Sequence, residues 1–223
     1  MSVYAERFWK RNWDEGLTDL EPSAFETTYV DLIKPTFEER PNKTALGYLG
    51  VEMTFGELDG YSNQFANMLL ENGFRKGDIV GINLPNTPEY VIALIGTLKA
   101  GCVVSGVSPL LSAPQVQYQM SDLGGGKRRL AFVTLDASFS EQIAKIAPEI
   151  PELALVITTS VAAFLPSLKR VLGRLTRKIP SGKVTPLAGK TVLDFHRDIL
   201  ARHSTDAPSV KLVPDDLGYV QYT

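Results

Sequence analysis

The chain has 223 residues, of which 44% are hydrophobic and 22% are charged, and its formal net charge is −2. A chain of this size can bury about 70% of the surface that its unfolded form exposes, so it needs neither disulfides nor metals for stability. The charge balance gives no reason to expect nucleic acid as a partner. One cysteine and two histidines exclude a disulfide framework and are too few for a typical structural zinc site.

No run in the sequence approaches the ~20 apolar residues of a membrane span. Residues 1–7 lack the apolar core of a signal peptide. Cys102 lies in the apolar run 102–104, which favours a buried and inert thiol over a nucleophile. We therefore expect a cytoplasmic protein.

The first elements in chain order are predicted as follows. Residues 1–25, rich in aromatic and charged side chains, should form a strap along the surface of a domain that spans 26–223. A helix over 28–39 follows, which Pro35 would bend or end early. A short strand is expected over 45–50. Thr54 and Glu57 have the spacing of a capping box, and the apolar positions of 55–69 predict a helix that Gly73 can close.

Strands and helices then alternate with short links. Buried strands are predicted over 78–84, 103–107, 130–134 and 153–158. Helices are predicted from Pro88 to about residue 100, over 112–123, and as one helix through Phe139, Ile143 and Ile146. This alternation predicts an α/β fold with three α/β/α layers and a mostly parallel sheet.

From residue 160 onward the composition changes. Apolar residues recur at helical spacing over 161–175, and no acidic residue occurs between Glu152 and Asp194. Seven basic residues give this stretch a charge of +7, so the rest of the chain carries −9. A membrane-facing surface over 160–190 is one interpretation. A helix packed on the domain, with a solvated basic face, is the other. A loop over 180–186, a helix over 192–201 and a strand over 216–223 are predicted to follow.

The common catalytic motifs are missing from this sequence. It has no GxSxG, HExxH, CxxC or complete GxxxxGK[ST] pattern. The run 124–127 (Gly-Gly-Gly-Lys) follows a predicted helix and enters a strand, whereas a phosphate loop follows a strand and opens a helix. We therefore interpret it as a helix stop and turn. His196 and His203 favour surface or packing roles over acid–base chemistry, and no catalytic residue is assigned.

Several short stretches together resemble the adenylate-forming superfamily. Residues 53–58 (Met-Thr-Phe-Gly-Glu-Leu) resemble its first conserved core, and 98–104 (Leu-Lys-Ala-Gly-Cys-Val-Val) with 108–109 (Ser-Pro) resemble the second. Residues 84–90 match the segment between them. Residues 219–223 (Tyr-Val-Gln-Tyr-Thr) are similar to the strand that leads into the ATP phosphate loop. The resemblance covers about 25–223 and implies the N-terminal subdomain of an AMP-forming ligase fold.

The resemblance implies a two-step reaction with ATP, Mg²⁺ and coenzyme A. A carboxylate and Mg-ATP give an acyl-adenylate and pyrophosphate, and coenzyme A then displaces AMP. Thr223 matches the threonine that begins the phosphate loop, so it is the expected contact to the ATP phosphates and their Mg²⁺. We expect the chain to end where that loop begins and to be inactive by itself.

Three stretches favour ligases of longer fatty acids within the superfamily. They are the aromatic start at 8–17, the segment 104–111 with its Ser-Pro-Leu-Leu, and the basic insertion that ends at 178–183. Another carboxylate, such as an aryl acid or a carrier-linked amino acid, stays open as substrate. A non-catalytic α/β interaction module is the alternative from a different class. A homodimer and peripheral membrane contact also stay open.

Overall fold

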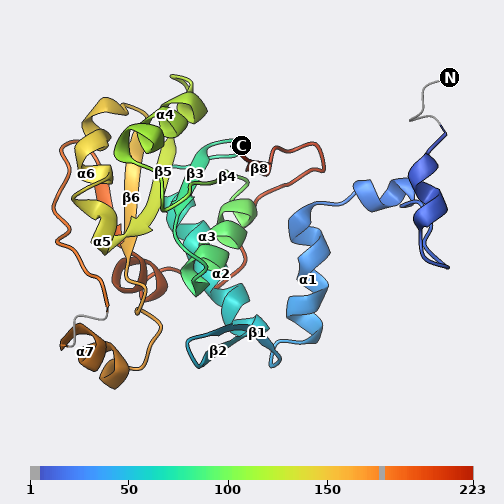
Figure 1. Ribbon diagram of the computed structural model, residues 1–223, viewed down its shortest axis with the longest axis horizontal. Coiled ribbons are helices and arrows are strands. Elements are labelled where there is room, and N and C mark those ends of the chain that lie inside the picture. Colours follow the sequence, from blue (N-terminus) through green and yellow to red (C-terminus); the bar gives the residue numbers. More distant parts are fainter. Residues whose placement is uncertain (1–5, 176–178, 223) are drawn as a thin grey trace.

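The computed structural model describes residues 6–175 and 179–222. Its centre is a six-stranded sheet in the order β7-β6-β5-β3-β4-β8, and every neighbouring pair is parallel. Helices cover both faces of this sheet (Figure 1), which confirms the predicted three-layer α/β/α fold. The strands are Ile79–Asn83 (β3), Val103–Gly106 (β4), Leu130–Leu135 (β5), Leu153–Thr159 (β6), Thr191–Asp194 (β7) and Tyr219–Val220 (β8).

The two faces of the sheet carry different helices (Figure 1). One face packs against α2 (Phe55–Glu71) and α3 (Pro88–Lys99). The other packs against α4 (Ala113–Gly124), α5 (Asp136–Phe139) and α6 (Ile143–Ile146). A small antiparallel sheet of β1 (Thr44–Tyr48) and β2 (Val51–Thr54) precedes α2. The sequence predicted β1 but not β2.

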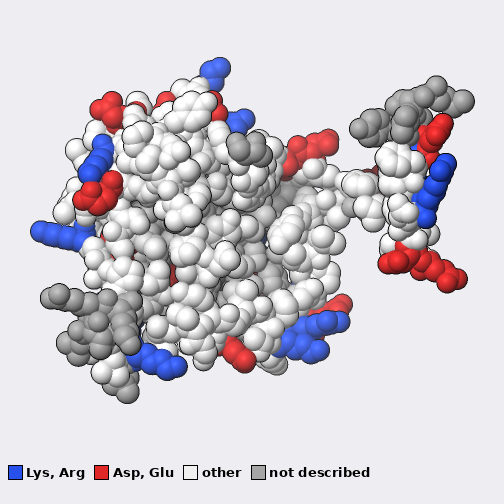
Figure 2. Space-filling model, viewed as in Figure 1, with Lys and Arg blue, Asp and Glu red and all other residues white. Residues whose placement is uncertain are grey.

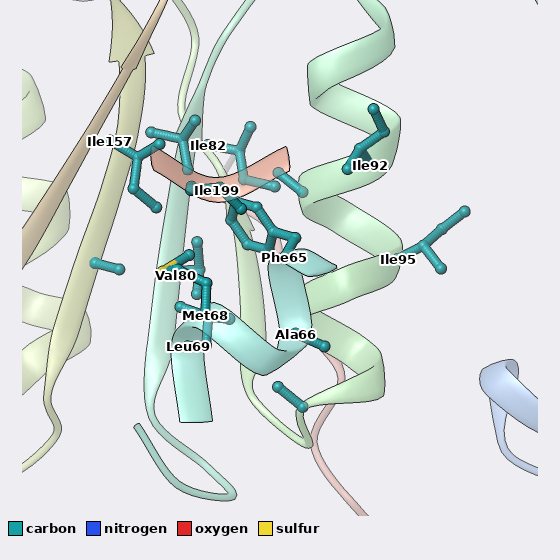
Figure 3. Close-up of a cluster of buried hydrophobic side chains, with 14 of the residues drawn as sticks. Phe65, Ala66, Met68, Leu69, Val80, Ile82, Ile92, Ile95, Ile157 and Ile199 are labelled. Carbon is teal, nitrogen blue, oxygen red and sulfur yellow. The ribbon is translucent and has the colours of Figure 1, made fainter. Parts of the chain in front are cut away.

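Successive residues of each central strand enter opposite cores, because side chains alternate across a sheet. Val80 and Ile82 of β3 face the α2 and α3 side, whereas Ile79 belongs to the core on the other side. Figure 3 shows Phe65 and Met68 of α2 between that helix and the strands of the sheet. Both side chains are fully buried, so α2 contributes a large part of this core.

The helices α2 and α3 approach closely at Gly96. A Cβ at this position would lie 2.7 Å from the Ser62 carbonyl oxygen and 2.8 Å from the Phe65 Cβ. Both of these atoms belong to α2, so a side chain at residue 96 would force the two helices apart. The close spacing between α2 and α3 therefore requires glycine at residue 96.

The predicted helix ends of this region are confirmed. Thr54 Oγ1 accepts from the Glu57 amide at 3.2 Å, and the Glu57 carboxylate accepts from the Thr54 amide at 2.8 Å, which completes the capping box. The interpretation of 124–127 as a helix stop also holds, because α4 ends at Gly124 and Gly125 has a φ of +51°. The glycine run is therefore a turn into β5.

Lys99, at the end of α3, is a buried cation. Its Nζ donates to Asp59 Oδ1 at 2.6 Å, to Asn63 Oδ1 at 2.7 Å and to Ser62 Oγ at 2.8 Å. Burial lowers the pKa of Lys99, while the bond to Asp59 opposes that shift. The Asp59 carbonyl oxygen lies 3.3 Å away as a further acceptor, so all the acceptors of Lys99 are in α2 and this residue ties α3 to α2.

The N-terminal segment differs from the predicted strap. Two short 3₁₀ turns, Phe8–Asn12 and Pro22–Phe25, precede α1 (Tyr29–Glu39), and Figure 1 shows them away from the body instead of along its surface. The division of the chain at residue 25 stays a prediction.

The helix α1 continues through Pro35 to Glu39. Pro35 is exposed, so water can satisfy the carbonyl that loses its helical partner.

Four other predictions need correction. The single helix expected through Phe139 and Ile146 is two four-residue helices, α5 and α6. The helix expected over 160–175 begins only at Ser167, as α7 (Ser167–Leu175). The helix over 192–201 is instead strand β7 followed by the π-helical turn η4 (Phe195–Leu200). The last strand covers only Tyr219–Val220.

The strand at 191–194, in place of the predicted helix start, has a cause in the tertiary structure. β7 pairs in parallel with β6, from Leu155 opposite Thr191 to Thr158 opposite Asp194. These backbone bonds come from a strand more than thirty residues earlier, which a periodicity over 192–201 cannot reveal.

Among the described residues, no helix is long and apolar enough to cross a membrane.

Candidate functional site

Buried polar side chains gather where the parallel strands end. Asn83 ends β3, Thr134 lies near the end of β5, and Thr158 and Thr159 end β6, and all four are buried. Thr134 Oγ1 donates to Asn83 Oδ1 at 3.3 Å. Open α/β sheets bind ligands outside the carboxyl ends of their strands, where the direction of strand succession reverses. In this sheet that reversal falls between β3 and β5.

Asn83 also fixes the loop that leaves β4. Its Nδ2 donates to the carbonyls of Val107 at 3.3 Å and Ser108 at 3.0 Å. Together with the bond from Thr134, these two bonds give the Asn83 side chain three partners at the end of a central strand. The loop that contains Ser108 and Pro109, part of the second conserved core, therefore has a defined position at the carboxyl edge.

The last described residues are held against β4 and α4. Ser105 Oγ donates to the Val220 carbonyl at 3.0 Å, and Gln119 Nε2 of α4 donates to Ser105 Oγ at 3.1 Å. The Tyr222 hydroxyl donates to the Asp122 carboxylate. Burial, followed by this contact with Asp122, raises the pKa of Tyr222 to about 12. Residues 219–222 therefore run parallel to β4 toward the carboxyl edge.

Thr223, the expected contact to ATP and Mg²⁺, lies outside the described residues. Its predicted role therefore stays a prediction. Within residues 6–175 and 179–222, no group of three or more His, Cys, Asp or Glu side chains could hold a metal ion.

The sequence did not single out Glu89 as a buried charge. Its side chain is only 2% exposed, near the start of α3. Glu89 Oε1 lies 3.0 Å from His196 Nε2 and accepts from Thr159 Oγ1 at 3.3 Å. Its charge also contributes, after burial, to the raised pKa of Tyr48. The only sequence signal was an acid in the first turn of a helix, which is common and usually solvated.

The two histidines have packing and pairing roles, as the sequence suggested. The His196 ring lies edge-on to Phe164, with 4.6 Å between the ring centroids, and its Nε2 contacts Glu89. His203 Nδ1 lies 3.1 Å from Glu71 Oε2, and this partner is an exposed carboxylate, unlike the buried Glu89. His196 therefore links η4 to α3 and to the segment after β6.

Cys102 is also inert, as predicted. The side chain is buried, and burial raises the pKa of its thiol to about 12, with a smaller contribution from the charge of Asp78. A thiol that remains protonated at neutral pH is a poor nucleophile. The structure therefore gives this cysteine a packing role.

A hollow of about 380 Å³ opens beside the start of α3. It is lined by residues of β1 and of the turn into α3, mainly apolar ones: Leu46, Gly47, Tyr48, Asn86, Thr87, Pro88, Tyr90 and Val91. The Thr87 hydroxyl in this wall is buried and has no hydrogen-bond partner. Burial, followed by contact with Tyr219, raises the pKa of Tyr90 to about 12, so its hydroxyl remains a neutral donor. These groups can bind and orient a ligand.

Comparison with known proteins identifies the family. The profile of the family described as AMP-binding enzyme matches residues 34–223. The chain belongs to this family of adenylate-forming enzymes. The stretches around Thr54 and Lys99, which resemble the conserved cores of this family, have structural roles here: one caps α2 and the other joins α3 to α2.

Curated relatives include long-chain-fatty-acid–CoA ligases. The protein of that name from Escherichia coli O157:H7 is 26% identical over 207 residues, which cover 92% of this chain and 36% of the relative. The one from Bacillus subtilis is 35% identical over 138 residues, which cover 62% of this chain and 24% of the relative. The AMP-binding chain described here thus spans about a third of the length of these relatives.

Solved structures with a similar fold come from several adenylate-forming enzymes. The anthranilate CoA ligase AuaEII in complex with anthranoyl-AMP has a TM-score of 0.70 at 23% identity, over 92% of this chain and 34% of that one. The nonribosomal peptide synthetase FmoA3 has a TM-score of 0.61 at 20% identity, over 100% of this chain and 18% of that one. At these identities the likeness supports the fold and leaves the substrate open.

Proposed function

We propose that this chain is the N-terminal part of the AMP-binding domain of a ligase that joins long-chain fatty acids to coenzyme A. The observation that carries the proposal is the family match over 34–223, together with fatty-acid–CoA ligases that align with 92% of the chain. In the proposed reaction, ATP and a fatty acid give an acyl-adenylate and pyrophosphate, and coenzyme A then releases AMP.

In this proposal the described residues position the reacting groups and do not take part in bond making. Asn83 and Ser105 hold the β4 loop and β8 at the carboxyl edge of the sheet. The chain leaving β8 would then carry Thr223 to the ATP phosphates. Backbone amides, a lysine and Mg²⁺ in such a loop would stabilise the charge that develops on the departing pyrophosphate.

The described residues fit Mg²⁺ poorly by themselves. No cluster of acidic, histidine or cysteine ligands occurs among them, and hydroxyl oxygens such as that of Thr223 bind the metal mainly together with phosphate oxygens. We therefore expect the 223-residue chain alone to bind no Mg²⁺ tightly and to release no pyrophosphate.

The test compares the 223-residue chain with the protein expressed from its complete gene. Each is given ATP, Mg²⁺, coenzyme A and one of three carboxylates: a long-chain fatty acid, an aryl acid or an amino acid. We expect the complete protein to release pyrophosphate and form a thioester with the fatty acid at a kcat/KM at least about tenfold above the others. Preference for the aryl or amino acid would assign another carboxylate.

The assay of the 223-residue chain by itself tests its proposed inactivity. Pyrophosphate release by the 223-residue chain, at a rate above background that co-elutes with it, would refute its proposed inactivity. An absence of turnover by the complete protein with every carboxylate would favour a non-catalytic interaction module instead.

A further inference from the structure

The basic stretch from 160 to 190 divides into two parts in the structure. Ala162 is fully buried, and the Phe164 ring lies 5.9 Å from the Tyr61 ring and 4.6 Å from that of His196. The Tyr48 hydroxyl donates to the Val161 carbonyl at 2.9 Å. For this first part the packing interpretation is therefore correct, and the apolar side chains belong to the body of the domain.

The second part, α7, has exposed apolar side chains. Val171 is 53% exposed and Leu172 is 52% exposed, and Lys169 next to them is exposed as well. The Arg170 guanidinium donates to the Ala163 carbonyl at 3.5 Å, which keeps a second positive charge at this corner. The sequence from 153 to 193 contains no acid, and the acid of the neighbouring hairpin is Glu52 in β2.

The turn between β1 and β2 adds an unusual leucine. Tyr48 pairs with Val51, so Leu49 and Gly50 form a two-residue hairpin turn, with φ values of +49° and +79°. Turns with two residues in the left-handed region favour Asn-Gly, because the Cβ of leucine crowds the following carbonyl oxygen in that conformation. Leu49 is 62% exposed, so packing within the chain offsets little of this cost. Such a residue points to a role outside the fold.

The hairpin turn and α7 lie at the same corner of the molecule. Lys169 Nζ is 3.8 Å from the position that a Cβ would take on Gly50. Figure 1 shows both elements at the lower end of the body, and Figure 2 shows a basic side chain beside the α7 corner. We define the hairpin–α7 patch as Leu49, Lys169, Val171 and Leu172.

We propose that the hairpin–α7 patch docks on an anionic lipid membrane. Apolar side chains on two neighbouring elements can insert at the boundary between head groups and acyl chains, while the cations contact anionic head groups. The patch on a second copy of this chain would bring like charges together, which disfavours self-association there. The positive charges of Lys169 and Arg170 instead match the negative surface of a membrane.

Vesicle co-sedimentation tests this proposal with the 223-residue chain and without ATP, so its outcome is independent of the proposed ligase activity. We compare neutral phosphatidylcholine vesicles with vesicles that also contain phosphatidylglycerol, at low and high salt. The bound fraction should be several-fold higher on anionic vesicles and should fall as salt rises. Lys169→Gln should weaken binding about fivefold, which corresponds to the loss of one cation near the surface.

The sharpest variant is Leu49→Asn, because asparagine suits the turn and leaves the fold intact. It should weaken vesicle binding roughly five- to tenfold, as expected for an apolar side chain that inserts in part. The melting temperature should stay the same or rise. Tyr118→Ser is the matched control: Tyr118 is 70% exposed on α4, which lies at the opposite end of the body in Figure 1. This variant should bind vesicles like the parent chain.

Three outcomes would overturn the proposal. One is full recovery of the parent chain in the supernatant under every condition. Another is binding that Leu49→Asn and Lys169→Gln leave unchanged. The third is binding of an acidic peptide such as polyglutamate, but not of vesicles, through Lys169, which would assign the patch to an acidic protein partner.

Discussion

Two stretches of similar length differ in how well the sequence predicted their structure. They are Thr54 to Gly101 and Ser160 to Leu200. In the first, helix α2 begins at its predicted cap and α3 at its predicted proline. In the second, a predicted helix became β7 and η4, and the predicted apolar stripe divided between core and surface. The difference teaches that a sequence pattern is decisive where the bonds that it implies are local.

Burial shows the same contrast. The first stretch forms two helices that pack on a central strand, so most of its apolar positions are enclosed from several sides. The second contains an edge strand, β7, whose residues are exposed or half-buried. An edge strand gains its stability mainly from backbone bonds to one neighbour, and that neighbour, β6, is distant in sequence.

The largest expected effect tests the packing of the first stretch. Gly96→Ala places a Cβ 2.7 Å from the Ser62 carbonyl oxygen, so α3 must move away from α2. Overpacking of this kind costs 1–3 kcal/mol, and the better helix propensity of alanine returns less than 1, so we expect a net loss of about 2 kcal/mol in the free energy of unfolding. Urea denaturation measures it.

Gly60→Ala is the control for this variant. Gly60 lies in α2, the helix that Gly96 of α3 approaches, but the atom nearest to its Cβ position is 3.7 Å away, on Thr205. We expect this substitution to stabilise the chain by about 0.5–1 kcal/mol through helix propensity alone. Equal effects of the two substitutions would show that the close approach at Gly96 is unimportant.

The second prediction concerns the contact that joins the two stretches. His196→Ala removes one of two partners of the buried Glu89 carboxylate and leaves Thr159, so it should cost about 1.5 kcal/mol of stability. In a Glu89→Gln background the same substitution should cost less, and the difference is the coupling between η4 and α3. Denaturation of the four proteins of this cycle gives the value.

Glu71→Gln provides the comparison for that cycle. It changes the ion pair with His203, in which the Glu71 side chain is 62% exposed, and should alter stability by no more than about 0.5 kcal/mol. A coupling near zero in the His196–Glu89 cycle would mean that the second stretch is stabilised without this link to the first.

The smallest of the three expected effects concerns the N-terminal cap of α2. Thr54→Ala removes the side-chain cap of α2 and should lower stability by about 1 kcal/mol. The turnover of folded complete enzyme should hardly change, because the only role assigned to the Thr54 side chain is to cap α2. A large fall in turnover with an unchanged melting temperature would instead assign this conserved core to catalysis.

The sequence by itself determined the elements whose signals are short-range. The Thr54–Glu57 capping box, the proline at the start of α3 and the glycine stop after α4 each act through bonds within a few residues. The alternation of apolar strands and amphipathic helices likewise determined the layered α/β fold, since each face of a parallel sheet must be covered. The ordered motifs then pointed to the family.

Only the tertiary structure decided the features that depend on distant partners. The strand β7 exists because β6 offers it hydrogen bonds, and Glu89 can be a buried carboxylate because His196 and Thr159 reach it from other elements. The division of the basic stretch into packed and exposed parts has the same origin. Phe164 packs against the core on the α2 side, whereas Val171 and Leu172 are exposed. Burial is a property of what surrounds a residue, and periodicity along the chain cannot supply that.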